Sequence, residues 1–349
     1  MIEVSCAVLR PGVKLAKAVY NPDGLLLIKP GERVQRGNID QLKRHQIDRV
    51  FMDWPDHGFP ESVQVVKEDT RRRAAEFISE SMSITYRQQI IEIERLQEQV
   101  AVILEEILDN EQALLNLTSM RSIDEYSFGH SINVCILSLV MGMMIELEPE
   151  ALRQLGLGAM VHDIGKVFID ADILNKPGPL EPEEYEQVKK HTLLGVSEIK
   201  NYNQLSKPVR EIIRHHHEWA NGSGYPDRLK NEEIPVMAKI VSICDVYDSL
   251  TSDRVYKERI QPQEALEYLL SMSGRQFDDY LLKRFFSCIR LYPSGMCVFL
   301  STGEKAEILS NNPHWPTRPV VKILANTAGE PVENLQIVDL SQKYGIEIM

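Results

Sequence analysis

Three consecutive histidines, residues 215–217, stand at the end of a predicted helix and before a turn in the string "RHHHEWANGSGYPD". Adjacent imidazoles fit poorly on a helix surface and poorly in an apolar core, whereas neutral imidazole is the commonest metal-ligating side chain. A bound metal would require further ligands from other parts of the chain. This feature therefore constrains the fold, because distant segments have to converge on these histidines.

Ligand-type residues occur in other helical segments, in apolar surroundings where an unpaired polar group would be costly. They are His130 in "EYSFGHSINV", His162 and Asp163 in "HDIGK", His191 in "VKKHTLL" and Asp245 in "CDVYDSL", and they add to His216 and His217. One such histidine alone would be a hydrogen-bonded structural imidazole. Because all of them occur together, we predict a metal site, and His215, which has no assigned role, is expected to face solvent.

The expected helix ends determine how these side chains reach one site. Adjacent residues of a helix point about 100° apart, so His162 and Asp163 reach one site most easily from a helix end, which we expect at Gly165. His191 is expected inside the helix that begins at Pro182. The site is thus expected where several helices come together.

The number of ligand-type residues indicates how many metals are bound. Seven His and Asp side chains are about what two adjacent octahedral sites need once water and substrate complete the coordination, and one carboxylate can bridge two cations. Nitrogen and oxygen ligands leave iron, manganese, nickel, cobalt and zinc open. Two such cations would lower the pKa of bound water, and their charge could hold a small anionic ligand.

The composition excludes several other classes of protein. The net charge of −12 disfavours polymeric nucleic acid as a partner, because that binding needs many basic phosphate contacts. The five cysteines include no CxxC pair, which argues against a disulfide framework and a thiolate zinc site. We find no run of about 20 apolar residues and no basic leader segment. A cytoplasmic protein without a membrane span is therefore expected.

The pattern along the chain predicts a mainly α fold with small β-containing parts at both ends. Residues 1–66 indicate a small α+β regulatory domain, with strands at "VKLAKAVY", "LLLIK" and "RVFM" and a helix near "IDQLKRHQ". Residues 119–292 are dominated by helical patterns and carry the ligand-type residues. In residues 293–349 the short runs "CVFL", "AEIL" and "PVVKIL" indicate a small β appendage.

Residues 67–118 form a connecting stretch with a helical pattern and no Pro or Gly. Apolar residues step by three and four along it, with one polar position: Ile93, Leu96, Val100, Ile103, Ile107, Asn110, Leu114 and Leu117. This heptad seam is typical of a coiled coil that joins two copies into a homodimer. It is equally typical of a helix that packs on the chain's own bundle, and the sequence leaves both possibilities open.

The helical region resembles the HD-GYP branch of the HD phosphohydrolases. The strings that carry the resemblance are "HDIGK" (162–166), "KKHTLLGVSEI" (189–199), "HHEWANGSGYP" (216–226) and "DVYDSLTSDRVYK" (245–257). The string "LRPGVKLAKAVYNPDG" and the β tail are similar to flanking regions of family members. The resemblance implies an HD-type helical bundle that opens cyclic di-GMP to linear pGpG, and often onward to GMP, in bacterial second-messenger signalling.

The resemblance also implies roles for individual residues. It implies metal ligation by His130, His162, Asp163, His191, His216, His217 and Asp245, with Asp163 as the bridge. Lys166 corresponds to the active-site lysine, which we expect to act on the leaving oxygen or on developing negative charge. Arg254 and Lys257 correspond to phosphate contacts. Tyr225 belongs to the loop that names the family, where its ring could stack on guanine or its hydroxyl reach a phosphate.

Two departures from the family pattern bear on these expectations. Members with three metals carry a Glu four residues before the first histidine, whereas this chain has Tyr126 there, and Glu125 is one step off that helix face. Two metals are therefore expected, and the family resemblance favours iron or manganese. The family's usual Asp in the GYP string is Asn221 here, which can equally cap the loop backbone.

Two alternatives to cyclic di-GMP hydrolysis remain open from the sequence. The chain could be a non-hydrolytic cyclic-dinucleotide sensor that relays occupancy through residues 67–118, or a hydrolase of another cyclic dinucleotide. Lys166 and the complete ligand set disfavour the sensor, and the loop around Tyr225 disfavours other substrates. The expected partners are the substrate, a second copy of the chain and diguanylate cyclase-type signalling proteins.

Overall fold

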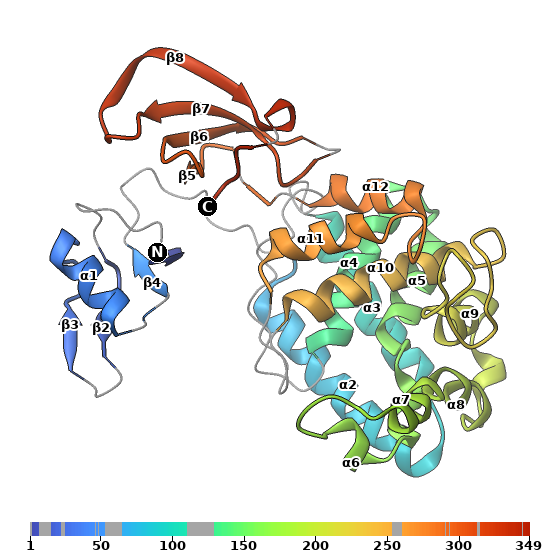
Figure 1. Ribbon diagram of the computed structural model, residues 1–349. Coiled ribbons are helices and arrows are strands. Elements are labelled where there is room, and N and C mark those ends of the chain that lie inside the picture. Colours follow the sequence, from blue (N-terminus) through green and yellow to red (C-terminus); the bar gives the residue numbers. More distant parts are fainter. Residues whose placement is uncertain are drawn as a thin grey trace.

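The computed structural model describes residues 2–6, 15–21, 25–45, 47, 49–52, 65–109, 129–252, 260–289, 291–292, 294–312, 315–343 and 345–349. Helices dominate it, with small antiparallel sheets near both ends of the chain (Figure 1). The predicted mainly α fold is therefore confirmed. No helix among these residues is both long enough and apolar enough to cross a membrane.

The N-terminal residues form a small α+β unit with its own apolar core. Two antiparallel pairs and one helix make it up: β1 (Ile2–Ser5) with β4 (Arg49–Met52), β2 (Val19–Tyr20) with β3 (Leu26–Ile28), and α1 (Arg36–Arg44). Its core side chains are Cys6, Leu15, Val19, Ile28, Val34, Leu42 and Val50. The helix and three strands were expected, whereas β1 was not.

The connecting stretch forms two helices within the described residues rather than one, α2 (Glu68–Gln88) and α3 (Ile93–Leu108). The break lies at Gln89, whose φ of 59° is left-handed. The side chain of Asn201 fills the hydrogen-bonding gap, since it accepts from the Ile91 N–H at 2.9 Å and donates to the Ile91 carbonyl at 2.8 Å. This break could not be predicted from the sequence pattern, because no Gly or Pro occurs near it.

The seam of α3 packs inside the chain's own bundle. Its buried positions are Leu96, Val100, Ile103 and Ile107, which belong to the same hydrophobic cluster as the central helices. Asn110, Leu114 and Leu117 lie outside the described residues. For residues 93–107 the structure therefore matches the second of the two possibilities, packing on the bundle, and leaves that face unavailable to a second copy.

The bundle is built around α4 (Gly129–Met144), which is buried from Ser131 to Gly142. His130 is the one histidine of this helix. Its apolar residues occur on all sides, which is the pattern of a helix at the centre of a bundle. Other helices pack around it (Figure 1). They are α5 (Pro149–Val161), α10 (Val236–Thr251) and α12 (Asp279–Cys288), together with α2 and α3. Two more helices, α9 (Lys207–His215) and α11 (Pro262–Ser271), pack against this group, α9 on α5 and α10 and α11 on α10 and α12.

Proline begins several of these helices, because its fixed φ suits the first turn and its missing N–H would be unpaired there anyway. Pro149, Pro182, Pro208 and Pro262 occupy such first-turn positions, and Pro235 is the residue before α10. The start of α7 at Pro182 was expected from the sequence. Two of these helices, α5 and α9, end directly before a ligand-type residue, because His162 is the C-cap of α5 and His216 is the C-cap of α9.

The C-terminal residues form a four-stranded antiparallel sheet in the order β5-β6-β7-β8. The strands are β5 (Cys297–Phe299), β6 (Lys305–Ser310), β7 (Val320–Ala325) and β8 (Pro331–Asp339). Alternate residues of β6 and β7, namely Ala306, Ile308, Val321 and Ile323, are buried in the main hydrophobic cluster. The small β appendage is confirmed, although β8 was not expected.

Candidate metal centre

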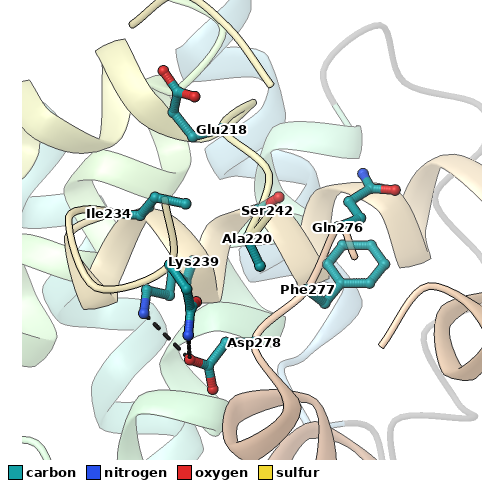
Figure 2. Close-up of a pocket in the computed structure, with 9 residues that line it drawn as sticks. Glu218, Ala220, Ile234, Lys239, Ser242, Gln276, Phe277 and Asp278 are labelled. Carbon is teal, nitrogen blue, oxygen red and sulfur yellow. Dashed lines mark hydrogen bonds and ion pairs between the residues drawn. The ribbon is translucent and has the colours of Figure 1, made fainter. Parts of the chain in front are cut away.

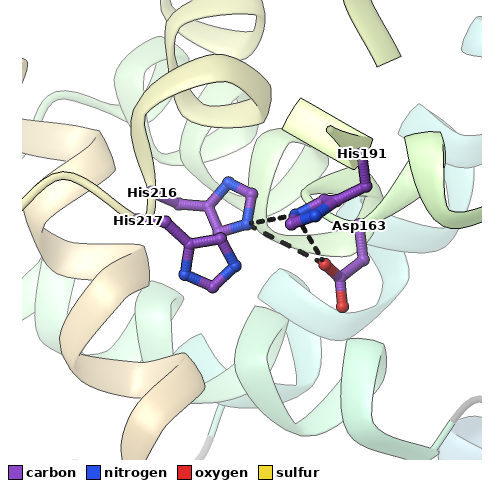
Figure 3. Close-up of side chains that lie close together, drawn as sticks. All are labelled: Asp163, His191, His216 and His217. Atoms are coloured by element: carbon purple, nitrogen blue, oxygen red, sulfur yellow. Dashed lines mark hydrogen bonds and ion pairs between the residues drawn. The ribbon is translucent and has the colours of Figure 1, made fainter. Parts of the chain in front are cut away.

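The structure brings the seven predicted ligand residues together from five segments. Their ligand atoms fall into two groups, and within each group all of them lie within 4.8 Å of one another. We call Asp163, His191, His216 and His217 the first group (Figure 3), and His130, His162 and Asp245 the second group. The convergence expected from the sequence is therefore present in the fold.

Asp163 lies between the two groups. Its Oδ1 is 3.3 Å from Nε2 of His191 and 3.8 Å from Nε2 of His216, in the first group. Its Oδ2 is 3.2 Å from Nε2 of His162, in the second group. Each carboxylate oxygen thus faces a different group, which is the arrangement that a bridging ligand needs.

The remaining ring nitrogens hold the imidazoles in a defined orientation. Nδ1 donates to a backbone carbonyl in His162, His191 and His216, over 2.7, 2.7 and 2.9 Å to Ala159, Val188 and Ile212 respectively. Because a carbonyl oxygen only accepts, Nδ1 carries the proton and the neutral ring leaves a lone pair on Nε2. These three Nε2 atoms point into the site.

Lone pairs that face one another show that the site fits a cation. Nε2 of His191 and Nε2 of His216 are 3.3 Å apart (Figure 3), within the about 4.2 Å that two metal bonds of about 2.1 Å can span. Nε2 of His162 and Oδ1 of Asp163 are buried without a hydrogen-bond partner. Buried polar atoms rarely remain unpaired, and a divalent cation would satisfy all of them.

The surroundings keep the imidazoles of the first group neutral and the carboxylate of Asp163 ionised. Burial lowers the pKa of His191, lowers that of His216 further, and lowers that of His217 to about 3. Burial raises the pKa of Asp163, but His162 and Lys166 outweigh burial and hold that pKa well below its usual range. These are the protonation states that metal binding requires.

The second group has a different electrostatic character. Nε2 of His130 is 3.1 Å from Oδ1 of Asp245, and its Nδ1 is 2.7 Å from Oδ2 of Asp248. Burial lowers the pKa of His130, but these two carboxylates outweigh burial and raise the pKa to about 9. A cation in this group competes with the proton on Nε2, so its affinity there falls as the pH is lowered.

Close backbone packing brings the 162–168 segment against His191. The helix α5 ends at Val161 rather than at Gly165, and a short 3₁₀ helix, η3 (Ile164–Phe168), follows. A Cβ atom on Gly165 would lie 1.9 Å from the carbonyl oxygen of His191. Only glycine allows this approach, which places Asp163 beside His191.

His191 is not inside the helix that begins at Pro182, contrary to expectation. That helix, α7 (Pro182–Lys189), ends before it, and His191 is the first residue of α8 (His191–Ser197). The string "KKHTLL" has no Gly or Pro, so the change of direction between α7 and α8 left no signal in the sequence. The change turns the imidazole toward Asp163.

The loop after His217 is held closely against the end of α9. A Cβ atom on Gly224 would lie 2.3 Å from the Trp219 backbone nitrogen, so this position also needs glycine. The ring of Tyr225 stacks on that of His217 with centroids 4.9 Å apart. Oδ1 of Asn221 accepts from the Ser223 N–H at 2.9 Å, which confirms its predicted capping role.

Two acidic residues without an assigned role hold this loop in place. The buried Glu218 accepts from the backbone N–H groups of Asp227 and Leu229 at 2.6 and 3.0 Å. Asp227 accepts from Arg214 at 2.7 and 2.8 Å and contacts Nε2 of His215 at 2.9 Å. The expectation that His215 faces solvent is therefore wrong, since its side chain is 13% exposed and pairs with Asp227.

A small pocket beyond this loop is closed by its own polar contacts (Figure 2). Asp278 accepts from Asn231 at 2.8 Å and from Lys239 at 3.3 Å, which joins the loop to α10 and to the start of α12. These contacts hold the loop against the helical bundle.

The predicted substrate-contacting residues have different outcomes. Nζ of Lys166 lies 2.6 Å from Oδ2 of Asp163, which places the ammonium group beside the ligand groups. Tyr225 lies beside the first group. Arg254, Lys257, Glu125 and Tyr126 lie outside the described residues. Asp248, which contacts His130, was not singled out, although it stands three residues after Asp245 on one helix face.

Comparison with known proteins gives the class to which this fold and site belong. A model described as "HD domain" matches residues 102–281, and a model described as "KOW domain associated with HD domain" matches residues 297–349. The first match covers more than half of the chain, so the chain belongs to the HD domain family. Within that family it is an HD-GYP protein, which confirms the resemblance stated from the sequence.

Individual relatives agree with this assignment. The chain is 34% identical to cyclic di-GMP phosphodiesterase PA4108 of Pseudomonas aeruginosa over 236 residues, which are 68% of this chain and 57% of that protein. It is 38% identical to 3'3'-cGAMP-specific phosphodiesterase 2 of Vibrio cholerae over 124 residues, which are 35% of this chain and 24% of that protein. The matches thus span little more than half of these relatives' length, or less.

A solved structure has the same fold over most of the chain. It is that of Bd1817, an HDG"Y"P protein from Bdellovibrio bacteriovorus, with a TM-score of 0.50 and 18% sequence identity. The similarity covers 81% of this chain and 97% of that one. At this level of identity the comparison supports the fold.

Proposed function

We propose that this chain is a metal-dependent phosphodiesterase that hydrolyses cyclic di-GMP to pGpG, GMP or both. The observation that carries the proposal is the pair of Nε2 atoms of His191 and His216, 3.3 Å apart, with Asp163 between them and the second group. Relatives such as PA4108 are named cyclic di-GMP phosphodiesterases. The protein would then act in bacterial second-messenger signalling in the cytoplasm, on substrate supplied by diguanylate cyclase-type proteins.

Two divalent cations are proposed, one for each group of ligand atoms, with Asp163 as their shared ligand. The donors are imidazole nitrogens and carboxylate oxygens, which suit iron or manganese and also accept nickel, cobalt or zinc. The described cysteines are buried and none belongs to either group, so thiolate ligation does not enter the proposal.

The chain's own residues would position and polarise the phosphodiester. When bound, the cations supply water of lowered pKa and a positive charge for the phosphate oxygens. Lys166 is half-exposed beside Asp163, so its ammonium group can donate to the leaving oxygen. His217 stacks on the Tyr225 ring and Lys189 Nζ lies over it, 5.5 Å from the ring centroid, so the Tyr225 hydroxyl is the group proposed to contact the substrate. Arg254 and Lys257 are proposed to bind phosphate oxygens.

The test is metal analysis and product analysis on protein purified without oxygen. We expect two equivalents of metal per chain. We also expect conversion of cyclic di-GMP to pGpG, which chromatography of the reaction mixture detects. Asp163→Asn serves as the matched inactive control. A protein that binds cyclic di-GMP stoichiometrically but releases it unchanged would contradict hydrolysis and indicate a sensor.

A second substrate is considered because of one comparison. The similarity to a 3'3'-cGAMP-specific phosphodiesterase extends over 124 residues at 38% identity. Comparing kcat/KM for cyclic di-GMP and 3'3'-cGAMP under identical metal loading distinguishes the two. A higher value for 3'3'-cGAMP would replace cyclic di-GMP as the proposed substrate and leave the metal centre unchanged.

A further inference from the structure

A chain of buried hydrogen bonds joins helix α2 to the second group. Arg71 Nη2 donates to Asn133 Oδ1 at 2.8 Å, and Asn133 Nδ2 donates to Asp248 Oδ1 at 2.8 Å. The other oxygen of Asp248, Oδ2, lies 2.7 Å from Nδ1 of His130. Arg71, Asn133 and Asp248 are 2%, 4% and 4% exposed, so solvent does not screen these contacts.

Only one assignment of donors and acceptors is consistent along this series of hydrogen bonds. A guanidinium only donates, so the side-chain oxygen of Asn133 must face Arg71 and its amide nitrogen must face Asp248. The carboxylate then uses one oxygen to accept from Asn133 and has the other available to accept from Nδ1 of His130. A cation bound in the second group would replace the proton on Nε2 of His130, and the proton that remains on Nδ1 would donate to Asp248 and fix the orientation of the ring.

Arg71 comes from outside the matched HD domain, which begins at residue 102. The helix that carries it, α2, packs against α4, which carries His130, and against η3, which carries Lys166. The helix thus touches the elements that present a predicted ligand and the predicted catalytic lysine.

We propose that Arg71 is a positioning residue for the metal of the second group, acting through Asn133 and Asp248 on the orientation and tautomer of His130. The proposal rests on the proposed metal-dependent function. It follows that loss of the Arg71 side chain lowers cation affinity in the second group, because this chain of hydrogen bonds ends at His130 and includes no residue of the first group. By linkage, a cation bound in the second group stabilises α2 in this position.

The test compares Arg71→Met with Arg71→Lys and with a control on the same helix. Removing a group that orients a ligand typically costs about 10–100-fold in metal affinity. We expect Arg71→Met to retain one tightly bound metal and to bind the second about 10–100-fold more weakly, and Arg71→Lys to recover part of this loss. The control is Arg72→Met, because the Arg72 side chain is 40% exposed and pairs with Asp69 and Glu76 on its own helix.

Two further readouts separate positioning from general destabilisation. In Arg71→Met, kcat for cyclic di-GMP should fall at limiting metal and recover at high metal, with KM little changed. In protein saturated with diamagnetic zinc, the ¹⁵N chemical shift of His130 Nδ1 reports its hydrogen bond to Asp248, and it should change in Arg71→Met but not in Arg72→Met. A general loss of fold would instead affect both metal groups and the other imidazoles.

A second variant keeps the test decisive if Arg71→Met does not fold. Asn133→Asp has the same shape and still accepts from Arg71, but it presents no donor to Asp248. It should lower metal affinity in the second group in the same way. Unchanged affinity for both metals in a folded Arg71→Met or Asn133→Asp protein overturns the proposal. Wild-type protein that takes up no divalent metal would instead overturn the proposed function, so the two failures are distinguishable.

Discussion

Gly165 approaches His191 so closely that a methyl group on it would lie 1.9 Å from the His191 carbonyl oxygen. Gly165→Ala must therefore push η3 away from α8 and draw Asp163 away from the first group. We expect a loss of about 1–3 kcal/mol in the free energy of unfolding, as for overpacked interiors, together with loss of first-group metal. Urea unfolding and metal analysis on the same preparation measure both effects.

The matched control is Gly37→Ala, because a Cβ at Gly37 meets nothing within 4 Å and the residue lies in α1. Alanine there should leave metal content unchanged and raise helix stability by up to about 1 kcal/mol. Equal metal content in Gly165→Ala and wild type would contradict the structural role given to Gly165.

Asp163 and Lys166 are 2.6 Å apart and yet should respond differently to mutation. Asp163→Asn removes the carboxylate shared by both groups and should abolish binding of both metals and all turnover. Lys166→Ala should keep both metals and lower kcat by about 10²–10⁴-fold, the usual contribution of a positioned acid or base. Single-turnover kinetics on metal-loaded protein measures the chemical step, and normal kcat in Lys166→Ala would remove this lysine from the mechanism.

Residue types and their order in the chain were sufficient to predict that the seven ligand-type residues converge. Each ligand-type residue interrupts an apolar helical pattern, and such residues must find partners in the core. The local geometry was not predictable in the same way. The α2–α3 break at Gln89 and the α7–α8 turn before His191 depend on tertiary contacts, such as that of Asn201, and no Gly or Pro marks them.

The same limit explains the residues that sequence reasoning passed over. Glu218 and Asp248 were visible in the quoted strings, but their functions depend on partners far along the chain or on backbone groups. A carboxylate that accepts from backbone N–H groups has no side-chain partner that a pattern could reveal. Arg71 resembles any other basic residue of the surface-like run "RRR" until its burial is known.

Glu218 should control how well the loop presents Tyr225 to the substrate. Glu218→Gln replaces one accepting oxygen by an amide group that faces the N–H of Asp227 or Leu229, at a cost of about 1–3 kcal/mol for the unpaired buried groups. We expect KM for cyclic di-GMP to rise with both metals retained. Isothermal titration with a non-hydrolysed analogue checks the loss of binding.

Tyr225 variants separate the ring from its hydroxyl. Tyr225→Phe keeps the stack on His217 and should affect only contacts made by the hydroxyl, whereas Tyr225→Ala also uncovers His217. A KM for Tyr225→Phe equal to that of Tyr225→Ala would assign the whole effect to the hydroxyl. An unchanged KM in both variants would remove Tyr225 from substrate binding.

The lowered pKa of Asp227 predicts how the stability of the fold depends on pH. The hydrogen bond from the Arg214 guanidinium lowers the pKa of Asp227 from its usual value of 3.8 to about 2, against a smaller effect of burial and with a further contribution from His215. A carboxyl whose pKa is lower in the folded state stabilises the fold above the unfolded-state pKa, and this contribution is lost as the pH falls through the folded-state pKa. Asp227→Asn should therefore be less stable than wild type at pH 7, and the difference should shrink between about pH 4 and pH 2. Thermal unfolding of both proteins across this range measures the difference. A gap that stays constant down to pH 2 would show that the Asp227 carboxylate charge does not stabilise the loop.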